Sequence, residues 1–174
     1  MWRRGDGGVE HVRVAVSRGG VDVDGVVALR GDDGGVRRLR YLLRCDTGWR
    51  VRDVDLHAAE DAASLSLHAG GVGRWSDAPR LDGCVDVDLE SVVFTNTLPI
   101  RRLSLPVGES AVVDVAFVRL PSMSVVPVQQ RYTHVAAGVY RYESLTSGFR
   151  ADLRVDADGL LVDYPGLARR LWAA

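Results

Sequence analysis

Residues 81–103 read LDGCVDVDLESVVFTNTLPIRRL, and this stretch decides the interpretation of the chain. Its first part alternates three apolar residues with three carboxylates: Val85, Val87 and Leu89 against Asp86, Asp88 and Glu90. Side chains point to opposite faces of a strand in turn, so the pattern predicts a strand with one apolar face and one strongly anionic face.

The carboxylates lie roughly 7 Å apart along such a strand, and each raises the cost of ionising its neighbour unless water or cations intervene. Arg101 and Arg102 follow closely and can supply positive charge. Two interpretations stay open. The anionic face is the solvated outer face of an antiparallel strand, or it lines an acidic pocket that accepts hydrogen bonds from hydroxyl-rich ligands such as sugars.

The second part of the stretch predicts the one clear helix of the chain, beginning near Thr97. We expect Thr97 to cap it, and Pro99 falls in the first turn, where its missing N–H does no harm. Arg101 and Arg102 would lie near the negative end of the helix dipole.

The rest of the chain predicts a mainly β protein, because strand patterns recur between short turns and no long segment has a sustained helical period. Glycine and aspartate predict hairpin turns at 31–35 and 156–159. The expected strands cover residues 12–16, 21–29, 36–44, 49–57, 64–68, 74–75, 84–90, 111–118, 123–134, 139–144, 149–156 and 160–164.

Three places are expected to depart from regular strand. Asp24 and Gly25 suggest a turn or bulge, and Pro127 suggests a bulge or an edge position. Residues 165–172 read either as a second short helix or as an extended tail.

Composition fits a single domain over residues 1–174. Basic and acidic residues are balanced, 22 against 23, which argues against nucleic acid as a partner. No apolar window approaches the ~20 residues that cross a bilayer, so stable membrane insertion is not expected. With no apolar segment behind the first arginines, we expect a cytoplasmic protein, in which Cys45 and Cys84 are buried apolar side chains.

The chemistry-bearing residues do not form a recognisable catalytic or metal motif. The four histidines are scattered, no Gly-x-Ser-x-Gly elbow occurs, and no cofactor or metal is expected. Paired carboxylates can hydrolyse glycosides, so a sugar-acting hydrolase or transferase that uses Asp86 and Asp88 stays open as an alternative.

A second cluster comprises Arg131, Tyr132, Tyr140, Tyr142 and Glu143. Tyr140 and Tyr142 share a strand face and could stack on a sugar ring while their hydroxyls form hydrogen bonds. Ordinary packing of tyrosines at the rim of a sheet explains the same pattern.

Several motifs together resemble the bacterial putative glycolipid-binding family, formerly a domain of unknown function. They are LDGC at 81–84, DVDL at 86–89, FTNTLPIRRL at 94–103, QRYT at 130–133, YRYES at 140–144 and DYPG at 163–166. The resemblance implies a many-stranded antiparallel sheet curled as a half-barrel around a single short α-helix, and a homodimer. It also implies an acidic pocket for glycolipid, with Asp86 and Asp88 as the matching carboxylates.

From the residues and the resemblance together, we expect a binding protein for a glycolipid or related amphiphile rather than an enzyme. A structural homodimer without a ligand is a further alternative. The expected ligand-binding residues are Asp86, Asp88, Glu90, Asn96, Arg101, Arg131, Tyr132, Tyr140 and Tyr142.

Overall fold

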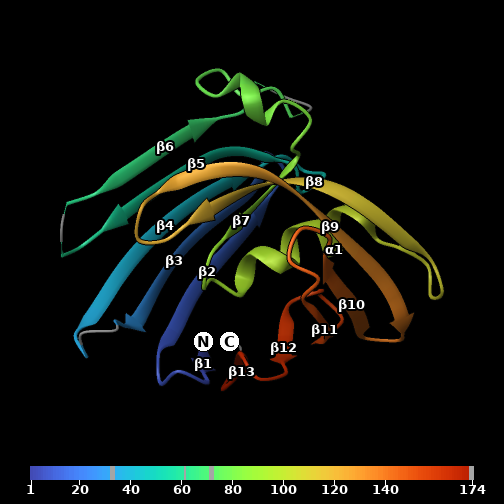
Figure 1. The fold of residues 1–174 in the computed structure, drawn as a ribbon. Helices are drawn as coiled ribbons and strands as arrows, with labels where there is room; N and C mark the ends of the chain where they lie inside the picture. The colour runs from blue at the N-terminus through green and yellow to red at the C-terminus, as the bar shows by residue number, and fades with distance from the viewer. Residues whose placement is uncertain (32–33, 61, 71–72, 173–174) are drawn as a thin grey trace.

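A computed structural model describes all residues except 32–33, 61, 71–72 and 173–174, and places the strands in one strongly curved sheet (Figure 1). The spatial order of the 13 strands is β6-β5-β4-β3-β2-β1-β13-β12-β11-β10-β9-β8-β7. The strands are β1 (Trp2–Arg4), β2 (Val9–Ser17), β3 (Gly20–Arg30), β4 (Val36–Cys45), β5 (Val51–Ala58), β6 (Ser64–His68), β7 (Asp86–Leu89), β8 (Ser110–Arg119), β9 (Ser124–Ala136), β10 (Val139–Ser144), β11 (Arg150–Val155), β12 (Leu161–Tyr164) and β13 (Ala168–Arg170). The predicted mainly β half-barrel is confirmed.

The hollow of the sheet holds the α-helix, α1 (Thr97–Leu103), directly after the 3-10 turn η2 (Phe94–Asn96) (Figure 1). A second 3-10 turn, η1 (Pro79–Leu81), precedes β7. Leu98 and Phe94 are completely buried, so the helix fills the centre of the half-barrel. No helix in the described part of the chain is long and apolar enough to cross a membrane.

The expected cap of α1 is wrong. Thr97 is the first helical residue, and no side chain caps the helix. The preceding turn η2 explains this, because the backbone N–H of Thr97 already donates to the carbonyls of Phe94 and Thr95. Pro99 does lie in the first turn, as expected.

Strand β7 departs from the antiparallel pattern of the sheet, because it pairs with β8 in parallel, with Asp86 beside Val115 and Asp88 beside Phe117. A parallel pair needs a long crossover, and the segment that contains η2 and α1 supplies it. The acidic strand is therefore tied directly to the helix that fills the hollow.

The expected turn at Asp24 and Gly25 is wrong, because β3 continues through both residues in unbroken register with β2 and β4. The ring of Tyr41 explains the glycine. A Cβ atom on Gly25 would lie 2.0 Å from Cζ of Tyr41, so any larger residue would displace the ring.

Pro127 lies in a regular part of β9 opposite Ala116 of β8, and β10 begins its pairing with β9 at Gln130. The expected bulge is absent, since the register with β8 does not shift at Pro127. β9 is an interior strand, but Pro127 lies beyond the part of it that pairs with β10, so this residue is locally on an unpaired side. Residues 74–75 contribute an isolated bridge between Ala69 and Trp75 rather than a strand.

The two ends of the chain meet in the middle of the sheet, where β1 pairs with β13 (Figure 1). The sequence predicted neither strand. The tail is extended over 168–170 and not helical, and the indole N–H of Trp2 donates to the carbonyl of Leu161 at 2.7 Å.

The predicted hairpins are present. β3 and β4 pair up to Arg30 and Val36, although Asp32 and Asp33 of the expected turn lie outside the described residues. At 156–159, Gly159 donates to the carbonyl of Asp156, and its φ of 71° is readily adopted by glycine.

Candidate functional site

A cavity of about 440 Å³ opens beside β7 and the segment that leads into η2. Its lining residues come from β7 to β10, from β1, η2 and β12, and from the loops between these elements. Its lining residues are Arg4, Asp88, Leu89, Glu90, Ser91, Val92, Val93, Asn96, Phe117, Arg119, Val128, Gln130, Tyr142, Ser144, Thr146, Ser147, Phe149, Tyr164 and Leu167. We call this space the Asp88 cavity.

Asp88 supplies the carboxylate of the cavity. One carboxylate oxygen accepts a hydrogen bond from the hydroxyl of Thr95 at 2.9 Å, and the other accepts one from the amide of Gln130 at 2.7 Å. Burial raises the pKa of Asp88 to about 6, although both hydrogen bonds act to lower it, and the neighbouring charge of Glu90 adds to the increase. Such a shift is typical of groups at functional sites.

Three aromatic rings pack together on one side of the Asp88 cavity. The ring centroid of Tyr142 lies 6.2 Å from that of Phe149 and 6.5 Å from that of Tyr164. Phe149 is 44% exposed, so the cluster reaches from the interior to the mouth. Ser144, Ser147 and Thr146 place hydroxyl groups along the same rim. The cavity thus combines apolar ring surfaces with hydrogen-bonding groups.

The opposite side is held by Arg4 and the backbone at Ser91. The Arg4 guanidinium is buried, pairs with Asp6 at 3.1 Å and donates to the carbonyl of Ser91 at 2.5 Å. Ser91 has a φ of 67°, an uncommon conformation for a residue with a side chain. Glu90 accepts a hydrogen bond from the backbone N–H of Leu120 at 2.6 Å. These contacts fix the path of the chain from β7 towards η2.

Asp86 does not line this cavity. Its side chain is fully buried, and its carboxylate faces the guanidinium of Arg102, with Nε of Arg102 3.0 Å from one oxygen. Burial raises the pKa of Asp86, and the ion pair with Arg102 acts against that increase. Asp86 and Asp88 lie only two residues apart on β7. Arg102 at the end of α1 covers the carboxylate of Asp86, whereas the carboxylate of Asp88 remains beside the cavity.

The remaining predicted site residues fall into two groups. Glu90, Asn96 and Tyr142 line the Asp88 cavity, and Tyr132 lies behind it, with its hydroxyl 3.1 Å from the side-chain oxygen of Asn96. Arg101, Arg131 and Tyr140 do not line it.

Arg101 and Tyr140 instead border a separate hollow of about 480 Å³ beside the end of α1. There the ring of Tyr140 stacks on His134 with a centroid distance of 4.3 Å, and the Arg101 guanidinium lies 5.0 Å from the ring centre of Trp49. Arg131 pairs with Glu143 at 3.7 Å. The expected tyrosine pair is therefore divided between two hollows.

Glu10 was missed by the sequence analysis, although it determines the geometry beside the cavity. It is completely buried in β2 and accepts hydrogen bonds from the hydroxyl of Tyr41 at 2.7 Å and from the backbone N–H groups of Val93 and Phe94 at 2.8 and 3.1 Å. Burial raises the pKa of Glu10, and the three donors oppose that increase. This carboxylate anchors the start of η2.

We expect Glu10→Gln to lower the free energy of unfolding by about 1–3 kcal/mol. The NH2 group of the new amide would face the groups that donate to Glu10, and at least one of these donors would be left buried without an acceptor. Chemical denaturation measures the loss. The exposed Glu109→Gln is the matched control, with an expected change within about 0.5 kcal/mol. Equal stability of the two variants would contradict an anchoring role for Glu10.

Gln130, Phe149 and Tyr164 line the cavity, and Thr95 binds its carboxylate, although none of them was predicted as a site residue. A signal existed for Gln130 and Tyr164, which lie in the QRYT and DYPG motifs. Thr95 lies in the FTNT block, but nothing in strand parity shows that its hydroxyl turns towards Asp88.

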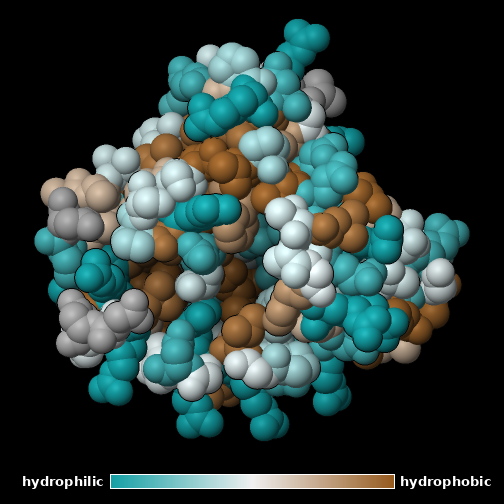
Figure 2. Space-filling view, viewed as in Figure 1, coloured by the Kyte–Doolittle hydropathy of each residue, from teal (hydrophilic) through white to brown (hydrophobic). Residues whose placement is uncertain are grey.

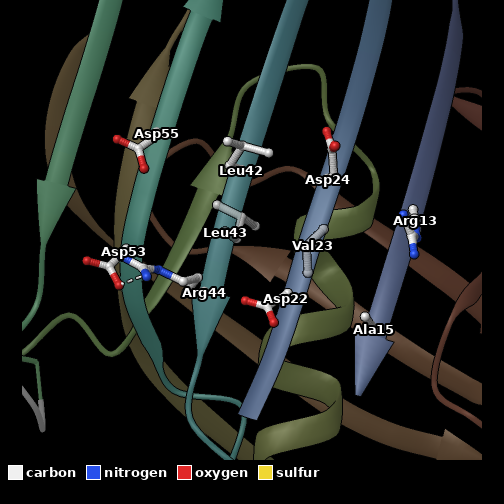
Figure 3. A pocket seen from close by; sticks show the side chains of 10 residues that line it. All are labelled: Arg13, Ala15, Asp22, Val23, Asp24, Leu42, Leu43, Arg44, Asp53 and Asp55. Atoms are coloured by element: carbon white, nitrogen blue, oxygen red, sulfur yellow. Dashed lines mark ion pairs between the residues drawn. The ribbon is translucent and has the colours of Figure 1, made fainter. Parts of the chain in front are cut away.

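A third hollow, of about 480 Å³, lies on the face of β2 to β5 that carries their exposed side chains (Figure 3). Three of its charged groups are in ion pairs: Arg44 with Asp53 at 3.0 Å, and Asp24 with the adjacent Arg40 at 2.9 Å. Ion pairs of this exposed kind are ordinary for the outer face of a sheet. Within the described residues, no group of His, Cys, Asp and Glu side chains is arranged to hold a metal ion.

The chain is thus a curled, mainly antiparallel half-barrel around one helix, with a cavity lined by both polar and aromatic side chains. The chain belongs to the family described as "Putative glycolipid-binding", whose model matches residues 1–170. A crystal structure of a DUF1089 family protein from Pseudomonas aeruginosa is similar to it, with a TM-score of 0.79 and 34% sequence identity over 93% of this chain and 92% of that one. No curated protein matches the chain.

Proposed function

We propose that the chain binds the sugar headgroup of a glycolipid in the Asp88 cavity and does not convert it chemically. The observation that carries this proposal is a desolvated carboxylate beside a cavity that is also walled by Tyr142, Phe149 and Tyr164. Sugar hydroxyls donate hydrogen bonds to carboxylates, and the C–H faces of sugar rings pack on aromatic rings. The family description supports the same class of ligand.

Non-enzymatic binding is favoured over glycoside hydrolysis by the position of Asp86. Hydrolysis needs two carboxyl groups that flank one scissile bond. Asp86 is paired with Arg102 and does not line the cavity, so the pair Asp86 and Asp88 cannot flank a sugar there. The presence of the cavity also favours a ligand-binding protein over a purely structural one.

Isothermal titration calorimetry with a panel of short-chain alkyl glycosides of glucose, galactose, mannose and rhamnose tests the proposal. We expect at least one sugar to bind the native protein, and Tyr142→Ala to weaken that binding about tenfold through loss of the stacking surface. Tyr140→Ala is the matched control, because Tyr140 borders the other hollow. Absence of binding to the whole panel, or equal losses in both variants, would count against the assignment.

Binding should depend on pH through Asp88. The pKa of its carboxyl is raised to about 6, so the ionised acceptor is present above that pH and is lost as the pH falls through it. We expect binding to be roughly tenfold weaker at pH 5 than at pH 8, as one proton per site requires. A pH-independent affinity over this range would show that the ligand does not use the ionised Asp88.

The homodimer, which the family resemblance implies, and the cytoplasmic location, which is expected from the sequence of the amino-terminal segment, are also part of this proposal. Light scattering coupled to size-exclusion chromatography gives the mass in solution. A mass of twice 18.9 kDa is the expected result.

A further inference from the structure

A fourth space, a groove of about 490 Å³, is lined by the end of β3, the start of β4, the segment after β5 and the turn that joins β8 to β9. Its aliphatic lining residues include Leu29, Leu39, Ala58, Leu120 and Met123, and the charged residues Arg30, Arg37, Arg38, Glu60 and Glu90 line it as well. Hydrophobic side chains are visible in a hollow beside the ends of these strands in Figure 2. Arg30, Arg38 and Glu60 stand at its rim, with Arg38 and Glu60 paired at 2.9 Å. We call this space the Met123 groove.

The Met123 groove adjoins the Asp88 cavity, because Glu90 and Ser91 line both. The position of these two residues is fixed from either side. Glu90 is bound to the backbone of Leu120 on the groove side, and the carbonyl of Ser91 is bound to Arg4 on the cavity side. A space lined by aromatic rings and a space lined by aliphatic and charged side chains therefore lie next to each other across two residues.

In the described part of the chain, the apolar side chains of η2 and α1 are packed into the core of the half-barrel. Phe94 and Leu98 are fully buried and Ile100 is 3% exposed. Close packing of this kind leaves no room for a hydrocarbon chain without displacement of the helix.

We propose that the Met123 groove holds a single aliphatic chain of the amphiphile whose sugar occupies the Asp88 cavity. This assignment rests on the proposed function and adds to it the place and number of the chains. Glu90 and Ser91 line both spaces, so a sugar headgroup in the Asp88 cavity brings the attached chain to the Met123 groove. The volume suits one chain, because pockets of about 300–1,000 Å³ accommodate ligands of drug size. The rim arginines can cover the chain with their apolar stems while their charges stay in water.

Calorimetric titration with n-alkyl glycosides of one sugar, from methyl to decyl and below their micelle concentrations, tests the assignment. Each methylene that enters the groove contributes about 0.8 kcal/mol, so affinity should rise about fourfold per methylene until the groove is full. In Met123→Asp the octyl glycoside should fall to the affinity of the methyl glycoside, whose binding should not change. Asp suits this position because Met123 has a φ of 55°.

A second variant, Ala58→Leu, partly fills the groove without adding charge. In this variant we expect the affinity for n-alkyl glycosides to stop rising at a shorter alkyl chain than in the native protein. Val107→Asp is the control, because Val107 is exposed and borders the hollow beside α1 instead. Equal dependence on chain length in the native protein and both groove variants would overturn the assignment, while binding of the methyl glycoside would leave the sugar site standing. Absence of binding by every glycoside in the native protein would overturn both.

Discussion

Asp86→Asn should lower the free energy of unfolding by about 3–5 kcal/mol, because it leaves the guanidinium of Arg102 without its counter-charge. The side chain of Arg102 is 15% exposed and that of Asp86 is fully buried, so little water is available to replace the ion pair. The pair also joins the last turn of α1 to β7. For a chain of this length, each kcal/mol corresponds to roughly 2–4 °C in melting temperature, and thermal denaturation would show the loss clearly.

The double variant Asp86→Leu with Arg102→Met distinguishes a charge left unpaired from a general intolerance of change at these positions. Replacement of both partners by apolar groups of similar size is often close to neutral, so we expect the double variant to recover most of the lost stability. A double variant as unstable as the sum of the two single ones would contradict this account. Wherever Asp86→Asn is still folded, its affinity for short-chain glycosides should equal that of the native protein.

Asp88→Asn should have the opposite effect on stability and a large effect on binding. The pKa of Asp88 is raised from 3.8 to about 6 in the folded protein, so the folded state holds its proton more tightly than the unfolded state. The contribution of this group to stability is therefore complete below about pH 4 and is lost as the pH rises through 6. At about 1.4 kcal/mol per pKa unit, the ionised Asp88 costs up to about 3 kcal/mol at neutral pH.

The partners of Asp88 are a hydroxyl and a side-chain amide, which can turn to accept from an asparagine, unlike the backbone N–H groups that bind Glu10. We accordingly expect Asp88→Asn to raise the free energy of unfolding at pH 8 by about 1–3 kcal/mol and to weaken glycoside binding about 10- to 100-fold. Loss of a charged hydrogen-bond acceptor, worth about 1.5–3 kcal/mol, accounts for the weaker binding. Asp114→Asn is the matched control, since Asp114 is exposed on neighbouring β8 and contacts Gln129 at 3.0 Å. Lower stability of Asp88→Asn at pH 8, or unchanged binding, would show that Asp88 serves the fold rather than a ligand.

The fold was largely predictable because its strands follow a period of two and its main turns contain glycine. The predictions failed where a distant residue decides the local structure. Gly25 looks like a turn residue, but it is required by the ring of Tyr41 on the next strand. β1 and β13 are only three residues each, too short for a periodic signal, and they exist because the chain ends pair with each other.

The candidate site was predictable in part. Strand parity placed Asp86 and Asp88 on one face, but it could not show that Arg102 would cover the first and that Thr95 and Gln130 would bind the second. Likewise Tyr140 and Tyr142 share a parity, but Tyr142 lines the Asp88 cavity and Tyr140 the other hollow, a division that parity alone could not predict. Glu10 lies in an ordinary alternating strand, and its role depends on contacts more than 80 residues away in sequence.

A crystal structure of the protein in complex with a short-chain alkyl glycoside tests the central claim most directly. The account predicts the sugar ring against Tyr142 or Tyr164, with a hydroxyl within about 3 Å of the carboxylate of Asp88. A sugar bound in the hollow beside α1 or on the outer face of β2 to β5, with the Asp88 cavity unoccupied, would contradict it.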